Sequence, residues 1–428
     1  MRRIAPALLL FTACSTAAYG DTESSAAGST GTSAATAATA ATSATDGDGA
    51  STGVPTTGGT GGGTTVVETG GETGGAGEDY GQAGANPPGN QTFTLELQGR
   101  SLLVEVWYPA DPAAQAAAEA GESIVEFVPP GPDRDALTGL LGMLGEPGKI
   151  GVTTQTHSAR DAAPADMSLR PRVVFAHCHR CTRFSVFTIA EHLASRGFIV
   201  AAPDHAGNTL FDELKGMSAD IGEEFLKVRV ADMSGVVDAL LDPNDQAVPA
   251  AIRGRIDPAK IGAMGHSYGS ATAGRLAQDD DRIVAAMPIF APVENPFFPG
   301  TKIADIAEPT LFALAVEDNS ILQIGNDLIG ANFKAAATPT RLLTIKDAGH
   351  WGVTDICGLV SGFDPGCGPG KRMTDGTDFT YLEPAIVRAA VGAYAAAFFD
   401  LHLRGNQSAA DYLDVAQPAA FVEVMSRP

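Results

Sequence analysis

The sequence predicts an α/β fold in which a mostly parallel central sheet is covered by helices on both faces. Six short apolar runs have the length and composition of buried strands: 172–176, 198–202, 260–264, 283–290, 310–316 and 341–345. Helix-like stretches, such as 187–196 and 224–241, separate several of these runs. Continuously apolar strands that alternate with helices are typical of a parallel sheet that is buried on both sides.

Three further segments complete the expected domain. Polar and apolar residues alternate over 92–108, which predicts an antiparallel hairpin. The Ala-rich stretch 384–403 has the apolar spacing of a helix that packs on the sheet. The insertion 121–165 is less regular, and we interpret its apolar segment 136–144 as a core helix, with a lid or the wall of an acyl pocket as the alternative.

The first 90 residues differ in composition from the rest of the chain. Residues 1–20 begin with two arginines and continue with an apolar run that is too short to span a bilayer, as in an export signal. Residues 21–90 are mainly Thr, Gly, Ala and Ser, so they cannot bury enough apolar surface to offset the entropy lost on ordering. We therefore expect a signal peptide, a flexible linker, and a folded domain at 91–428.

The end of the export signal contains a short motif around a cysteine. Phe11-Thr12-Ala13-Cys14 resembles the lipobox of bacterial lipoproteins. The resemblance implies that Cys14 becomes a lipidated first residue, which would tether an extracytoplasmic protein to a membrane. The alternative is simple secretion, with cleavage after Ala18 or Gly20.

The charge balance restricts the possible partners. The chain carries a formal net charge of −22, and residues 21–90 contribute eight acidic residues and no Lys or Arg. An acidic domain without basic clusters argues against nucleic acid as a partner. It suggests a neutral or apolar substrate.

The segment Gly265-His266-Ser267-Tyr268-Gly269 lies between the strand 260–264 and a helix-like stretch. This G-x-S-x-G pattern turns the chain sharply from strand to helix, so that the serine hydroxyl stands clear of the sheet. The small residues at both ends allow close backbone approach, and the helix N-terminus adds a positive dipole. We predict that Ser267 is a nucleophile, and the alternative is a structural serine in a turn.

A serine nucleophile needs a histidine base. Only two histidines follow Ser267, and His402 lies in the middle of a predicted helix, where a surface or packing role suits it better. His350 follows the strand 341–345 and is the predicted base.

A carboxylate must orient that base. Asp318 follows the strand 310–316 and is the predicted acid, because its place one residue further into the loop lets a short side chain reach the imidazole. Glu317 and Asp355 are the alternatives.

Backbone amides should stabilise the oxyanion that forms on attack. One is the amide of Tyr268, directly after the nucleophile. The other is expected in the loop after the strand 172–176, where Cys178 or His179 is the donor.

Four cysteines follow Cys14, and an even number in an exported chain favours disulfides. Three pairings are possible, and proximity favours Cys178–Cys181 and Cys357–Cys367. The segment 177–181 (HCHRC) could be a metal site instead, but such crowded ligands make a tetrahedral site awkward. We therefore expect no metal and no other cofactor.

The segments 173–209, GHSYG and AGHWGVTDIC resemble the α/β-hydrolases identified as predicted dienelactone hydrolases, which are related to bacterial platelet-activating-factor acetylhydrolase-like esterases and, more distantly, to cutinases. The resemblance covers 92–404 and implies the α/β-hydrolase fold. The family's triad corresponds to Ser267, Asp318 and His350. The resemblance implies hydrolysis of a small or lipid-like carboxylic ester. True dienelactone hydrolases use a cysteine nucleophile, so the serine at 267 makes dienelactone itself an unsuitable substrate.

A serine esterase that works through an acyl-enzyme is therefore the leading expectation. The alternatives are an inactive surface binding protein on the same fold, or a peptidase or acyltransferase with the same triad. Several aromatic residues are candidates either for an apolar acyl pocket or for the core: Phe184, Phe187, Phe297, Phe298 and Trp351. Of these, Phe184 and Trp351 are the predicted substrate-binding residues.

Overall fold

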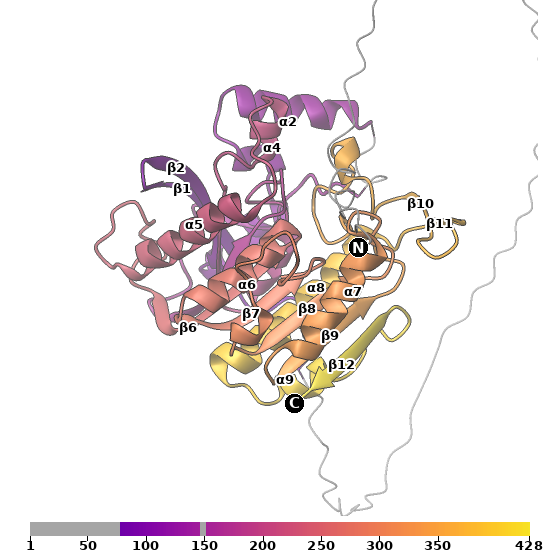
Figure 1. Ribbon diagram of the computed structural model, residues 1–428. Helices are drawn as coiled ribbons and strands as arrows, with labels where there is room; N and C mark the ends of the chain where they lie inside the picture. Colours follow the sequence, from indigo (N-terminus) through magenta and orange to yellow (C-terminus); the bar gives the residue numbers. More distant parts are fainter. Residues whose placement is uncertain (1–77, 146–150) are drawn as a thin grey trace, which may run out of the picture. The chain divides into compact units, whose positions relative to one another are not determined.

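The computed structural model describes residues 78–145 and 151–428, and its centre is a ten-stranded sheet (Figure 1). The strand order is β12-β9-β8-β7-β6-β4-β5-β2-β1-β3. The bounds are β1 (Pro88–Leu97), β2 (Arg100–Pro109), β3 (Ala159–Arg160), β4 (Arg170–Ala176), β5 (Ile199–Pro203), β6 (Ile256–His266), β7 (Ile283–Ile289), β8 (Thr310–Ala315), β9 (Thr340–Ile345) and β12 (Val422–Arg427).

The six neighbouring strands from β5 to β9 are parallel to one another, and they coincide with the six apolar runs of the sequence. The hairpin β1–β2 and the last strand β12 join this group in antiparallel pairings. Because β1, β2 and β12 lie toward the two edges, the middle of the sheet is parallel and buried. The predicted mostly parallel sheet is confirmed.

Helices cover both faces of the sheet. Along β4, Val173 and Phe175 point into one apolar core, while Val174 and Ala176 point into another, as the alternation of a strand requires. The first core contains α3 (Phe187–Ser195) and α8 (Pro384–Phe399). The second contains α5 (Glu223–Leu241), α6 (Tyr268–Asp279) and α7 (Leu322–Ala335).

Shorter elements fill the connections. They are η2 (Pro112–Ala114), α1 (Gln115–Ala120), η3 (Ile124–Phe127), α2 (Pro132–Met143), α4 (Leu210–Leu214), η5 (Ile303–Asp305), η6 (Ser361–Phe363), β10 (Pro369–Lys371), β11 (Asp378–Thr380), η7 (Asp400–Arg404) and α9 (Ala409–Leu413). The apolar segment of the insertion forms most of α2, in which Leu137 is fully buried but Met143 is exposed. It therefore packs on the core by one side only.

The helix α8 continues directly into the π-helical turn η7. Among the residues described, Pro384–Arg404 is the one helical segment that is long and apolar enough to cross a membrane by length and composition. Its most apolar stretch is 78% buried inside the protein, which is the environment of a core helix.

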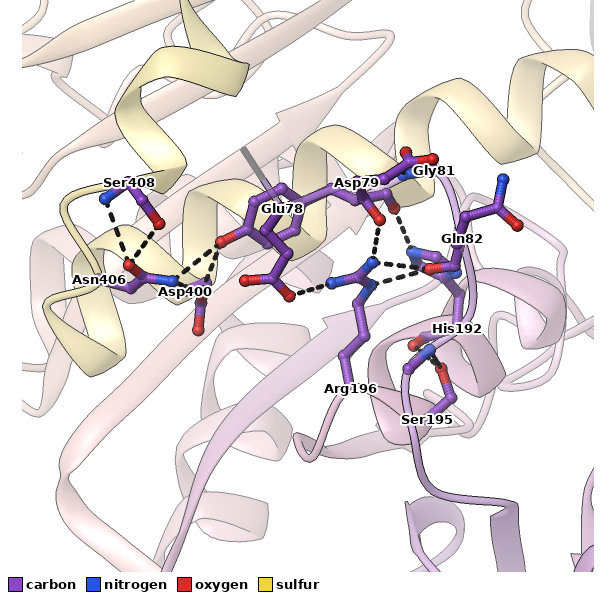
Figure 2. A network of polar contacts seen from close by, with 12 residues as sticks. Glu78, Asp79, Gly81, Gln82, His192, Ser195, Arg196, Asp400, Asn406 and Ser408 are labelled. Carbon is purple, nitrogen blue, oxygen red and sulfur yellow. Dashed lines mark hydrogen bonds and ion pairs between the residues drawn. The ribbon is translucent and has the colours of Figure 1, made fainter. Parts of the chain in front are cut away.

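The folded domain begins earlier than residue 91, which corrects the predicted boundary. Strand β1 starts at Pro88, and residues 78–86 lie against α3 and the end of α8 through the polar contacts drawn in Figure 2. We call residues 78–86 the N-terminal latch. The predictions for residues 1–20, for Cys14 and for the linker up to residue 77 lie outside the described residues.

Tyr80 is the centre of the latch. Its ring is 1% exposed and lies under the guanidinium of Arg196, 4.8 Å from the ring centroid. Its hydroxyl donates to Asp400 Oδ2 at 2.6 Å, and its carbonyl oxygen is 3.0 Å from Nε2 of His192. Both burial and the neighbouring carboxylate of Asp400 raise the pKa of Tyr80, so the phenol stays protonated and donates. One aromatic side chain thus connects α3 to the segment after α8.

We expect Tyr80→Ala to lower the unfolding free energy by about 3–5 kcal/mol, the usual cost of truncating a buried aromatic residue. Tyr80→Phe keeps the ring and removes only the hydrogen bond to Asp400, so its cost should be about 1–3 kcal/mol. Thermal and urea unfolding of the three proteins measure both effects. Equal stability of wild type and Tyr80→Ala would show that the latch contributes nothing to the fold.

Candidate active site

Ser267 occupies the turn between β6 and α6. Its backbone has φ 58° and ψ −118°, a conformation that non-glycine residues rarely adopt. The surrounding backbone maintains it, because Ser267 N–H donates to Ile289 O at 2.9 Å and Ser270 N–H donates to Ser267 O at 2.8 Å. The side chain is half-buried, so the hydroxyl stands at the surface of the sheet's carboxyl edge.

The two glycines of the pentapeptide permit close packing around this turn. A Cβ on Gly265 would overlap the backbone of Gly269. A Cβ on Gly269 would overlap the carbonyl groups of Ala176 and His177, at the end of β4. The serine turn therefore rests directly on the backbone that leads into residues 177–181, which we call the oxyanion loop.

The structure brings the predicted serine, base and acid together. Nε2 of His350 lies 2.8 Å from Oγ of Ser267, and Nδ1 of His350 lies 2.8 Å from Oδ2 of Asp318. The other carboxylate oxygen of Asp318 accepts from the amides of Ser320 and Ile321, at 3.0 and 3.1 Å. Asp318 is 0% exposed and His350 is 2% exposed, so water does not compete for the bond between them.

The alternative acids have other partners. Glu317 accepts from Arg372 at 2.9 Å and from the amide of Met373 at 2.8 Å, so it anchors the segment before β11. Asp355 accepts from Thr188 and lies 3.1 Å from Nε of Arg388. The geometry therefore agrees with Asp318 as the partner of the histidine.

His402 lies on η7, as its sequence position suggested. Its ring packs edge-on against Phe398, with centroids 4.8 Å apart, and burial lowers its pKa to about 4. It is a neutral packing residue.

His266 is a site residue that the sequence analysis did not identify. It is fully buried, and its Nε2 lies 2.9 Å from the carbonyl oxygen of His350. Burial lowers the pKa of His266 well below its usual value, so the ring is neutral and its N–H can donate to that carbonyl. His266, at the first variable position of G-x-S-x-G, thereby fixes the backbone of His350. The G-x-S-x-G pattern does not specify the residue at this position, so it could not indicate this role.

The oxyanion loop is closed by a disulfide between Cys178 and Cys181, whose Cα atoms are 5.2 Å apart. The second disulfide joins Cys357 to Cys367, with Cα atoms 6.1 Å apart, so both pairings agree with the prediction from proximity. Since the two cysteines of HCHRC are bonded to each other, they are not thiolate ligands for a metal.

His177 orients the peptide between Cys178 and His179. The amide of His205 donates to Nε2 of His177 at 3.0 Å, so Nδ1 carries the proton and donates to the Cys178 carbonyl at 2.7 Å. In a trans peptide the C=O and N–H groups point in opposite directions. The His177 ring therefore sets the direction of the His179 N–H, which with the Cys178 N–H is one of the two candidates for the donor in this loop. Tyr268, the donor predicted after the nucleophile, is the first residue of α6, where an N–H has no acceptor within the helix.

The predicted substrate-binding aromatics are corrected by the structure. Phe184 is 0% exposed and stacks on Phe127, with ring centroids 5.0 Å apart. Trp351 is 3% exposed and stacks on Phe363 at 4.1 Å. Both side chains therefore belong to the hydrophobic core and not to an open pocket. Their apolar partners lie on other segments of the chain, which sequence spacing does not reveal.

We expect Gly269→Ala to destabilise the protein by about 3 kcal/mol, the upper end for overpacked sites, because the new methyl group meets backbone that cannot rotate away. Gly139→Ala is the matched control. Gly139 lies on α2 with open space around its Cα, so alanine should leave stability unchanged or raise it by about 1 kcal/mol. Thermal unfolding compares the two variants, and equal midpoints would contradict the tight packing at the turn.

Comparisons with known proteins agree with this architecture. The model of the dienelactone hydrolase family matches residues 159–352. Cutinase est2 of Thermobifida alba is 30% identical over 137 residues, which are 32% of this chain and 38% of that protein. Cutinase est1 of the same organism is 28% identical over 170 residues, 40% of this chain and 50% of that protein. The chain thus spans half or less of the length of these curated relatives.

A solved structure covers more of the chain. The ferulic acid esterase from Streptomyces cinnamoneus matches with a TM-score of 0.59 and 24% identity, over 82% of this chain and 100% of that chain. At this level of identity the match shows that the two chains share a fold. This chain has the α/β-hydrolase fold.

Proposed function

We propose that this protein is a serine esterase that hydrolyses carboxylic esters through an acyl-enzyme intermediate. One observation carries the proposal: Ser267, His350 and Asp318 form a continuous chain of hydrogen bonds at the strand-to-helix turn. The family match at residues 159–352 and the two cutinase relatives support ester hydrolysis as the reaction.

The proposed reaction has two halves. Nε2 of His350 takes the proton from Ser267 while the serine oxygen forms a bond to the ester carbonyl carbon, and the resulting imidazolium faces the carboxylate of Asp318. The imidazolium then protonates the departing alcohol as the ester C–O bond breaks. In the second half, His350 deprotonates a water molecule, whose oxygen attacks the acyl carbon. The bond from that carbon to the serine oxygen then breaks, the imidazolium returns its proton to Ser267, and the acid is released. The amide of Tyr268 and an amide of the oxyanion loop stabilise the negative oxygen in both halves.

The proposed substrate is a small or lipid-like ester without a negative charge. The acidic chain repels polyanions, and the names of the relatives describe enzymes that act on cutin and ferulic acid esters.

We expect Ser267→Ala to lower kcat/KM for short p-nitrophenyl esters by at least about 10⁴-fold, because the triad acts as a unit and the nucleophile cannot be replaced. A fluorophosphonate probe should label the wild type at Ser267 and leave the variant unlabelled, as read by mass spectrometry. An unlabelled wild type would favour an inactive binding protein on this fold, and equal hydrolysis by both proteins would exclude Ser267 as the nucleophile.

The neighbouring carboxylates at the end of β8 provide a matched pair for that experiment. Asp318→Asn should lower kcat by about 10⁴-fold, because an amide cannot hold the required histidine tautomer or stabilise the imidazolium. Glu317→Gln keeps the shape of the side chain that anchors Arg372, so its kcat should stay close to that of the wild type. The opposite result would transfer the acid role to Glu317.

We also propose that the protein is exported and tethered to a membrane through a lipid on Cys14. The lipobox-like segment at 11–14 and the two disulfides support this proposal, since disulfides persist in oxidising compartments. Mass spectrometry of the mature N-terminus should find a lipidated Cys14 as the first residue, and Cys14→Ser should move the protein to the soluble fraction. An unmodified N-terminus beyond residue 14 would contradict the tether.

A further inference from the structure

A buried arginine lies beneath the serine turn and the oxyanion loop. Arg229 belongs to α5 and is 0% exposed. Its guanidinium donates to Oγ1 of Thr272 at 3.0 Å, to Oδ1 of Asn208 at 2.9 Å, and to the carbonyl oxygen of His177. The proposed triad uses none of these groups.

Each of the three contacts reaches a different part of the predicted oxyanion hole. Thr272 lies on α6 and donates to the carbonyl oxygen of Tyr268 at 2.9 Å. Asn208 follows β5 and donates to Nδ1 of His179 at 2.7 Å. His177 begins the oxyanion loop. One guanidinium therefore joins the helix after the serine to the loop that faces it.

The hydrogen bond from Arg229 to the His177 carbonyl fixes the direction of the next N–H group. The carbonyl of His177 and the N–H of Cys178 belong to one trans peptide and point in opposite directions. When Arg229 holds that carbonyl, the Cys178 N–H must point away from the guanidinium. The ring of His177 holds the next peptide through the Cys178 carbonyl. Buried side chains thus set the direction of both candidates for the loop donor, Cys178 N–H and His179 N–H.

The charge of Arg229 is not neutralised by these contacts. Its three acceptors are neutral oxygens, and the guanidinium lies 4.7 Å from the centroid of the Tyr268 ring. Asp232, one turn further along α5, is engaged by Arg100 and by His205. Burial lowers the pKa of Arg229 to about 9, so the group remains charged at neutral pH.

A buried charge without a counter-ion is costly, and the folded protein must hold it in place by hydrogen bonds. A negative charge that forms nearby in a dry site would be attracted strongly, because the local dielectric constant is low. The oxyanion of an acyl-transfer reaction is such a charge, and it exists only during the reaction.

We propose that Arg229 is a positioning residue of the oxyanion hole, which aims the backbone donors of the oxyanion loop and places a permanent positive charge beneath them. This inference rests on the proposed esterase function and adds a group that does not itself touch the substrate. It predicts that Arg229 acts on the transition state and not on the binding of the ester.

The test compares Arg229→Gln and Arg229→Lys with the wild type. Loss of one direct oxyanion donor lowers kcat by about 10²- to 10³-fold. Arg229 acts only through the loop, so Arg229→Gln should lower kcat by less, about 10- to 100-fold, with little change in KM. Arg229→Lys keeps the charge without the planar fork, and it should recover part of the loss. Rates are expressed per Ser267 that a fluorophosphonate labels at completion, so misfolded protein does not enter the comparison.

A second measurement separates positioning from stability. Ester and thionoester substrates differ only in the atom that enters the oxyanion hole, so their rate ratio reports how well that atom is held. The rate with the ester divided by the rate with the thionoester should decrease in Arg229→Gln. A trifluoromethyl ketone, which forms a tetrahedral adduct with the serine, should bind more weakly by about the same factor by which kcat/KM falls. A purely structural role would lower the unfolding temperature and leave both measurements unchanged.

Arg172 provides the matched control. It is also 0% exposed, and burial also lowers its pKa to about 9, but it lies near the start of β4, at the opposite end of the strand that leads into the oxyanion loop. Arg172→Gln should therefore lower stability without changing kcat or the rate ratio.

The outcomes separate this inference from the proposed function. Full labelling of Ser267 together with an unchanged kcat and rate ratio in Arg229→Gln would overturn the role of Arg229 alone. No labelling of the wild type and no ester hydrolysis would overturn the esterase function itself.

Discussion

The close contact between two backbones is the constraint on which the site depends. Because Gly269 has no side chain, the first turn of α6 lies against the carbonyl groups of Ala176 and His177. This contact sets the spacing between Ser267 and the oxyanion loop, which come from adjacent strands of the sheet. Backbone contacts vary less than side-chain contacts, since they involve no rotamers. The spacing of the proposed nucleophile and the proposed oxyanion donors is therefore a property of the fold.

The loops that carry the acid and the base are connected by a separate set of contacts. Arg372, in the segment between β10 and β11, binds Glu317 next to the acid and Asp347 near the base. Asn319 donates to the carbonyl oxygen of Lys371 and to the hydroxyl of Tyr381. The segment 371–381 thus connects the loops that follow β8 and β9.

The features that the sequence predicted correctly are local in the chain. The parallel strands and the strand-to-helix turn at Ser267 follow from short patterns whose geometry is fixed over a few residues, whereas the roles of Ser267, Asp318 and His350 stay a prediction. The core positions of Phe184 and Trp351 could not be predicted, because the same aromatic residue suits a pocket and a core equally well. Tyr80 was missed for another reason: a single aromatic residue within a polar stretch carries no periodic signal.

Buried polar contacts were the least predictable part of the site. His177 depends on the amide of His205, 28 residues away, and Arg229 depends on Thr272, 43 residues away. Nothing in the composition around a lone arginine on an amphipathic helix distinguishes a buried guanidinium from a solvated one. Only the packing of α5 against α6 reveals which face it occupies.

The net charge of the chain and the charge of Arg229 have opposite signs, and the two act at different stages of the proposed reaction. The protein carries −22 overall, yet the hydrogen-bond acceptors of Arg229 in the described part of the chain are neutral oxygens. The oxyanion that forms on attack is absent from the ground state, so its attraction to that guanidinium acts on the transition state alone. The attraction then lowers the barrier to attack. The buried cation therefore bears on the rate of attack, and the expectation of an uncharged ester rests on the acidic composition of the chain.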